Sequence, residues 1–167
     1  MAESSQSQQR AEVLKERIYI TFTSLAIVLA LSSHADELSS GSVATTLLIG
    51  VSGTLLAVFV ADLVAHIAVH AQLPNRAELA HMVSVSTRAL GVVVLPLVFV
   101  GLAAAGVWDV PLALRASTIV LIVSLIAIGY LAAHRVRLRL SQRLIVLFAE
   151  FVLGVAVVLL EVLAHHG

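Results

Sequence analysis

The chain has 167 residues, of which 60% are hydrophobic and 12% charged, and its mean hydropathy is +1.05. A soluble domain is roughly 45–50% apolar and about 25% charged, so a chain this small and apolar requires the lipid bilayer as its partner and solvent. The net charge is zero and cysteine is absent. These two facts exclude a general attraction to nucleic acid, disulfide bonds and thiolate metal sites.

Five apolar segments follow a polar start. We predict an all-α, polytopic membrane helical bundle with five transmembrane helices, because about 20 apolar residues are needed to cross the hydrocarbon core. Residues 1–15 are predicted to be a disordered cytosolic tail, and residues 16–167 a single five-span domain. The first apolar run, 18–33, is short and reaches span length only with the interfacial turn that contains Glu16 and Arg17. The expected spans are 16–34, 43–71, 79–107, 110–133 and 143–165.

Lysine and arginine in the connecting segments set the expected orientation. The residues before 18, the 72–78 connection and the 134–143 connection are basic, whereas the 34–42 and 108–109 connections carry only acidic charges. Basic loops stay inside, so the N-terminus is predicted inside and the C-terminus outside. An alternative remains: the small residues around His34 resemble a signal-peptidase site, and cleavage there would leave four spans.

Three ionisable residues are expected at one depth in the inner half of the bundle. Asp62, Arg88 and Glu150 each lie about 10–13 Å from the inner end of their spans, at about 1.5 Å per residue. Arginine is always charged and needs a counter-ion, and two carboxylates leave one negative charge for a proton, a cation or a protonated His66. We therefore predict a proton or ion pathway through Asp62, His66, Arg88 and Glu150. Pro96, within the third span, is expected to kink its helix.

A second charged layer is expected in the outer half of the bundle. Arg115 and Glu161 both fall within roughly 8 Å of the outer boundary, at about 1.5 Å per residue, and His34 lies nearby. Charges at these depths are costly unless they are paired, hydrated or functional. We expect Arg115, Glu161 and His34 to line the outer entry of the pathway.

Asp62, His66 and His70 follow one another at i, i+4 and i+8 along one helix face. Adjacent pairs of such side chains can chelate a divalent metal, so a metal site is a further candidate. Asp62 and His70 lie about 12 Å apart along the axis, so one ion cannot bind all three. No zinc-protease motif, nucleophile elbow, phosphate-binding loop or dinucleotide fingerprint occurs, and no enzyme or cofactor is predicted.

These patterns favour a small membrane protein that conducts, transports or senses protons or small cations. At this size, such a protein is expected to work as a homo-oligomer or as a subunit of a membrane complex. The alternative function is a non-catalytic membrane subunit or scaffold, in which buried ion pairs fix the register of the helices. An intramembrane enzyme acting on lipid has no motif in its support.

Overall fold

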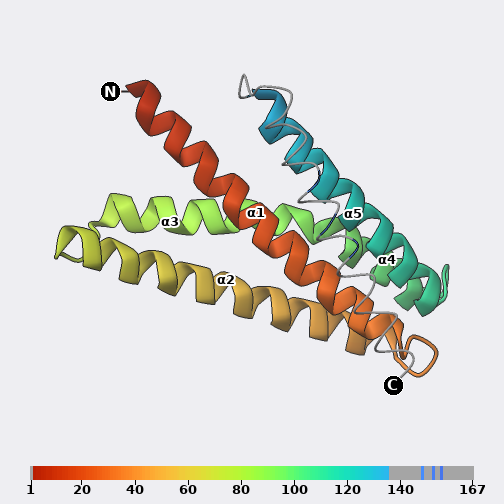
Figure 1. Cartoon of the computed structure of the whole chain (residues 1–167). Helices are drawn as coiled ribbons and strands as arrows, with labels where there is room; N and C mark the ends of the chain where they lie inside the picture. The colour runs from red at the N-terminus through yellow and green to blue at the C-terminus, as the bar shows by residue number, and fades with distance from the viewer. Residues whose placement is uncertain (1, 136–147, 149–151, 153–154, 156–167) are drawn as a thin grey trace.

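The computed structural model describes residues 2–135 and the single residues 148, 152 and 155, and this part of the chain is helical without strands. The all-helical fold class is thereby confirmed. The predicted span 143–165 lies almost entirely outside the described residues. The elements, drawn in Figure 1, are α1 (Ala2–Ser32), α2 (Ser40–His70), α3 (Arg76–Ala89), the 3-10 helix η1 (Leu90–Val92), α4 (Val94–Ala104) and α5 (Val110–Arg135).

Helix α1 begins at Ala2, so residues 2–15 are helical, whereas the sequence analysis predicts a disordered tail there. The reason is local composition, because Ala, Gln, Glu, Lys and Arg are strong helix formers and dominate this stretch. The apolar part of α1, residues 18–32, covers only roughly 22 Å at about 1.5 Å per residue. By length and apolarity, α1 is not among the candidate membrane spans of the described residues.

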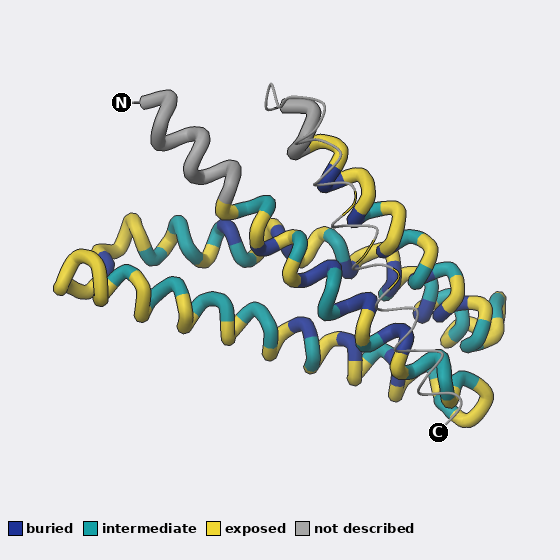
Figure 2. The backbone as a smooth tube through the Cα atoms, viewed as in Figure 1, coloured by how far each residue is buried: buried dark blue, intermediate teal, exposed yellow. Residues whose placement is uncertain are grey.

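Two described helices are long and apolar enough to cross a membrane: α2 over its full length and α5 over Val110–Leu131. A third candidate is the bent pair Arg76–Val92 and Val94–Ala104, if it forms one span. In the most apolar 18-residue stretch of α2, only 11% of the residues are buried, so most of its apolar side chains face away from the other helices. Figure 2 shows the burial concentrated where the helices cross. Such an outward apolar surface is typical of a helix in contact with lipid.

The third segment bends by 47° between α3 and α4. Pro96 lies in the first turn of α4, where its ring has no N–H to donate and crowds the carbonyl of Val92. The chain adapts by tightening residues 90–92 into η1, and α4 then continues with the hydrogen bond from the Leu97 N–H to the Val93 carbonyl, 3.0 Å. The kink expected from Pro96 is present.

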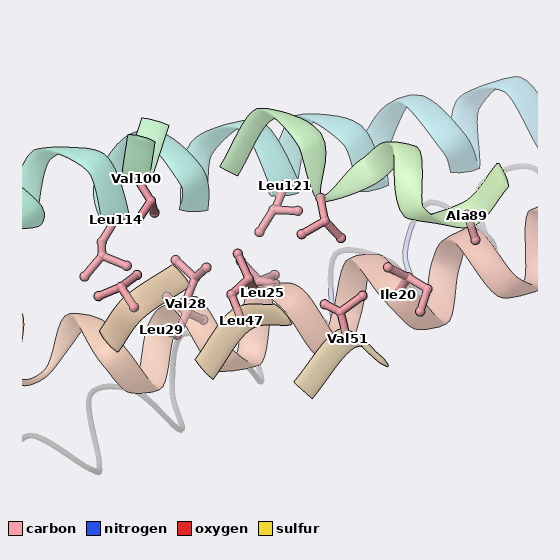
Figure 3. Close-up of a cluster of buried hydrophobic side chains, with 12 residues drawn as sticks. Ile20, Leu25, Val28, Leu29, Leu47, Val51, Ala89, Val100, Leu114 and Leu121 are labelled. Carbon is pink, nitrogen blue, oxygen red and sulfur yellow. The ribbon is translucent and has the colours of Figure 1, made fainter. Parts of the chain in front are cut away.

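The apolar core lies where α1 crosses the other helices (Figure 3). Helix α1 contributes Ile20, Leu25 and Val28, and α5 contributes Leu114 and Leu121, all 2% exposed or less. Helix α2 adds Leu47 and Val51 from the opposite side. The core therefore joins α1 to both candidate spans, and the first turns of α1 diverge from the hairpin of α2 and α3 (Figure 1).

Gly50 of α2 lies against the end of the Ile27 side chain of α1. A Cβ added there would collide with Ile27 of α1, whereas one added at Gly53 on the same helix would meet nothing within 4 Å. We expect Gly50→Val to destabilise the fold by about 1–3 kcal/mol through overpacking. Gly53→Val changes helix propensity equally and is the control. Thermal unfolding of both variants in detergent checks this, and equal effects at the two positions would refute the packing argument.

Candidate functional site

Eight ionisable residues line one cavity of about 680 Å³ between α1, α2 and α3. The turn between α2 and α3 brings these two helices together: Ala71 takes a left-handed conformation (φ 52°) that ends α2, and Asn75 caps α3. The cavity is lined from α1 by Glu12, Lys15 and Glu16, from α2 by Asp62, Ala65, His66, Val69 and His70, and from the start of α3 by Asn75, Ala77, Glu78, His81, Met82 and Val85.

Lys15 and Asp62 join α1 to α2 across the cavity. The Lys15 Nζ lies 3.1 Å from the Asp62 Oδ1, and both side chains are partly exposed. Partial burial alone would lower the pKa of Lys15, but the hydrogen bond and charge of Asp62, with smaller contributions from Tyr19 and Glu16, outweigh it and raise that pKa. Lys15 is therefore a stable cation beside Asp62.

Two histidines each face a carboxylate from a neighbouring helix. His66 of α2 lies 3.6 Å from Glu78 of α3, and His81 of α3 lies 3.4 Å from Glu12 of α1, measured from Nε2 to Oε2 in both pairs. Glu78 is held in place by a capping box, in which its Oε2 accepts a hydrogen bond of 2.7 Å from the Asn75 N–H. With Lys15 and Asp62, these contacts form a closed ring of pairs through α1, α2 and α3.

Glu16 is the most unusual group of the site, because its residue is only 2% exposed. Its Oε1 accepts a hydrogen bond from Ser86 at 3.3 Å, whereas its Oε2 is buried and has no hydrogen-bond partner among the described residues. Glu16 lies in the turn before the apolar stretch that begins at residue 18. Burial raises the pKa of Glu16, and the hydrogen bond from Ser86 only partly opposes this. Glu16 therefore holds its proton more tightly in the folded protein than an exposed glutamate does.

The predicted inner layer is only partly assembled by the described residues. Asp62 and His66 both line the cavity, but Arg88 is exposed on α3 and forms no ion pair within the described part of the chain. Asp62 pairs with Lys15 of α1, whereas the sequence analysis considers Arg88 as its partner. Glu150 lies outside the described residues.

The predicted outer layer is only partly within the described residues. Arg115 is exposed on α5, and His34 is exposed in the turn after α1, where its Nδ1 lies 3.0 Å from the Ser33 Oγ. Glu161 lies outside the described residues. Between residues 2 and 135, no contact joins Arg115 to His34.

Asp62, His66 and His70, which the sequence suggests as metal ligands, all line this cavity. No group of three His, Asp or Glu side chains among the described residues is arranged to hold a metal ion. His66 and His70 instead stack with ring centroids 4.4 Å apart, and the His70 Nδ1 lies 3.2 Å from the carbonyl of its own helix at His66. Spacing along one helix placed these side chains on one face, but it did not make them converge.

Three charged residues of the cavity were missing from the sequence-based site: Glu12, Lys15 and Glu78. Glu12 and Glu16 are spaced i, i+4 and Lys15 lies between them, so they share one side of α1 once the helix is extended to this point. The expectation of an irregular tail concealed this face. The signal was the helix-forming composition before residue 18.

Comparisons with models of known protein families, with curated proteins and with solved structures give no match to this chain. The fold and site by themselves define an all-helical protein with two, or up to three, candidate membrane-spanning helices among its described residues and a polar cavity between α1, α2 and α3.

Proposed function

We propose that this chain is a multi-pass protein of the cell membrane whose cavity binds and releases protons or small cations, as a conduit, transporter or sensor. The observation that carries the proposal is Glu16, a buried carboxyl group with a raised pKa in the wall of a cavity that also contains three histidines. A buried carboxyl group and imidazole rings are side chains that can take up and release protons.

The proposed topology has five spans, with the N-terminus inside and the C-terminus outside. Its support is the apolar surface of α2 and α5, the bent pair α3 and α4, and two further apolar stretches at 18–32 and 143–165. The basic connections at 72–78 and 134–143 favour this orientation. In this arrangement the cavity lies at the inner end of the bundle, open to protons of the cytosol.

A pathway across the membrane requires groups beyond the cavity. Arg88 on α3 and Glu150 in the fifth span are the proposed next groups, followed by Arg115, Glu161 and His34 near the outer surface. The exposure of Arg88 supports a partner outside the described residues, either Glu150 or a carboxylate of a second copy. A homo-oligomer would also cover part of the exposed apolar face of α2.

The ring of pairs favours a second candidate function, that of a membrane subunit or scaffold. Lys15–Asp62, His66–Glu78 and Glu12–His81 each connect two different helices, which is what a purely structural network would do. In that case the charges would hold α1, α2 and α3 in register, and the protein would carry no flux of its own.

Proton uptake into proteoliposomes under an imposed membrane potential, read by an internal pH dye, tests the proposal. We expect the purified full-length chain to acidify the lumen faster than protein-free liposomes do. Absence of proton flux from folded protein, repeated with sodium and potassium as the permeant ions, would reject the transport proposal and favour the scaffold.

A further inference from the structure

The cavity carries more negative than positive groups. Its lining contains four carboxyl groups and one lysine, together with three histidines. Asp62 is matched by Lys15, Glu78 by His66 and Glu12 by His81. Glu16 alone among these carboxyl groups has no ion-pair partner within the described residues, since its recorded contact is the hydroxyl of Ser86.

The geometry of Glu16 indicates a missing hydrogen-bond donor. Its residue is 2% exposed, it lines the cavity, and its Oε2 has no hydrogen-bond partner among the described residues. Buried polar atoms are nearly always paired, and an unpaired one requires an explanation. A cationic N–H donor bound in the cavity would satisfy both the oxygen and the charge of this group.

The other residues that line the cavity indicate which kind of cation fits it. Ala65, Val69, Met82 and Val85 make one part of the lining apolar, and the volume of about 680 Å³ falls within the range of small-molecule sites, roughly 300–1,000 Å³. A bare divalent ion is a poorer fit, because it takes several converging oxygen ligands and the described residues contain no group of three suitable side chains. An ion with both an ammonium group and an apolar body matches the two parts of the wall.

We propose that this cavity binds a small organic ammonium ion, with its ammonium group on Glu16 and its apolar body against Val69, Met82 and Val85. The inference rests on the proposed function, since it names the cation that exchanges with protons at the same site. The ammonium ion pairs with the carboxylate form of Glu16, so at a pH where this carboxyl group is protonated, binding releases its proton to water. The other titratable groups facing the cavity are Glu12 and Lys15 of α1, Asp62, His66 and His70 of α2, and Glu78 and His81 of α3.

Calorimetric titration of the full-length protein in detergent with phenethylammonium chloride tests this. The neutral isostere 2-phenylethanol has the same apolar body without the charge. We expect the ammonium ion to bind at least about tenfold more tightly than the alcohol, and Glu16→Gln to remove this preference. Glu37→Gln, in the exposed turn after α1, should leave it unchanged. Titration of the wild type in two buffers of different ionisation enthalpy should show proton release, a result that does not depend on any variant folding.

Equal affinity for the ion and the alcohol, or binding of the ion without proton release, would overturn the proposal. A preference that survives in folded Glu16→Gln would overturn the role of Glu16. The experiments distinguish failure of the proposed transport function from failure of the ammonium-binding proposal. Proton flux without ammonium binding would reject the ligand alone, whereas ammonium binding without any flux would retain the site and reject transport.

Discussion

Replacing Asp62 by asparagine should reduce proton flux to the level of protein-free liposomes while the protein stays folded. Asp62 lines the cavity, lies 3.1 Å from Lys15 and is the group through which we expect protons to leave the cavity for the membrane interior. Asparagine keeps the size and can still accept a hydrogen bond from the Lys15 ammonium, but it carries no titratable proton. The fold should survive because a partly exposed ion pair contributes about 0–1 kcal/mol.

Asp36→Asn is the matched control for this substitution, since Asp36 is exposed in the turn at the far end of α1. Its flux should equal that of the wild type. Thermal unfolding in detergent verifies that both variants are folded. Unchanged flux in folded Asp62→Asn would remove Asp62 from the pathway, and a large loss of stability instead of flux would favour the scaffold function.

The largest loss of stability is expected from Leu121→Ala. Leu121 of α5 is 0% exposed and belongs to the core cluster in which α1 meets α5 (Figure 3). Truncating it removes apolar contacts and leaves a cavity, so we expect a loss of about 2–5 kcal/mol in the free energy of unfolding. Leu112, on the same helix, is 47% exposed, and Leu112→Ala should stay within about 0.5 kcal/mol of the wild type.

Chemical unfolding of the two leucine variants in one detergent measures the difference. A similar loss at both positions would mean that α5 does not pack against α1 through this face. Such a result would also mean that this core does not fix the position of α1 against the hairpin of α2 and α3, on which the cavity depends.

Hydrophobic patterning was sufficient to predict the all-helical class, because runs of apolar residues at span length leave few other folds in lipid. It also located the Pro96 kink, which follows from a missing backbone donor. It did not predict where α1 begins, because low hydrophobicity in residues 2–15 indicated disorder while the same residues have high helix propensity. This single difference concealed Glu12 and Lys15 as partners for His81 and Asp62.

Depth along a span does not by itself determine which side chains pair. Arg88 and Asp62 lie at similar distances from the inner ends of their predicted spans. Asp62 nevertheless contacts Lys15, and Arg88 is exposed on α3. A pair forms only if two helices also rotate the right faces toward each other, and neither rotation nor crossing angle follows from periodicity alone. The cavity was predictable only in part, since its groups come from three helices whose crossing is set by core residues such as Ile20 and Leu47.

The central claim is that Glu16 holds an exchangeable proton in the cavity, and infrared spectroscopy tests it most directly. The carbonyl stretch of a protonated carboxyl group, present in the wild type and absent in Glu16→Gln, can be followed as a function of pH. Because burial raises the pKa of Glu16, we expect this band to disappear with a midpoint above the ordinary value of 4.5. A midpoint at or below 4.5 would contradict the account, because Glu16 would then hold its proton no more tightly than an exposed glutamate.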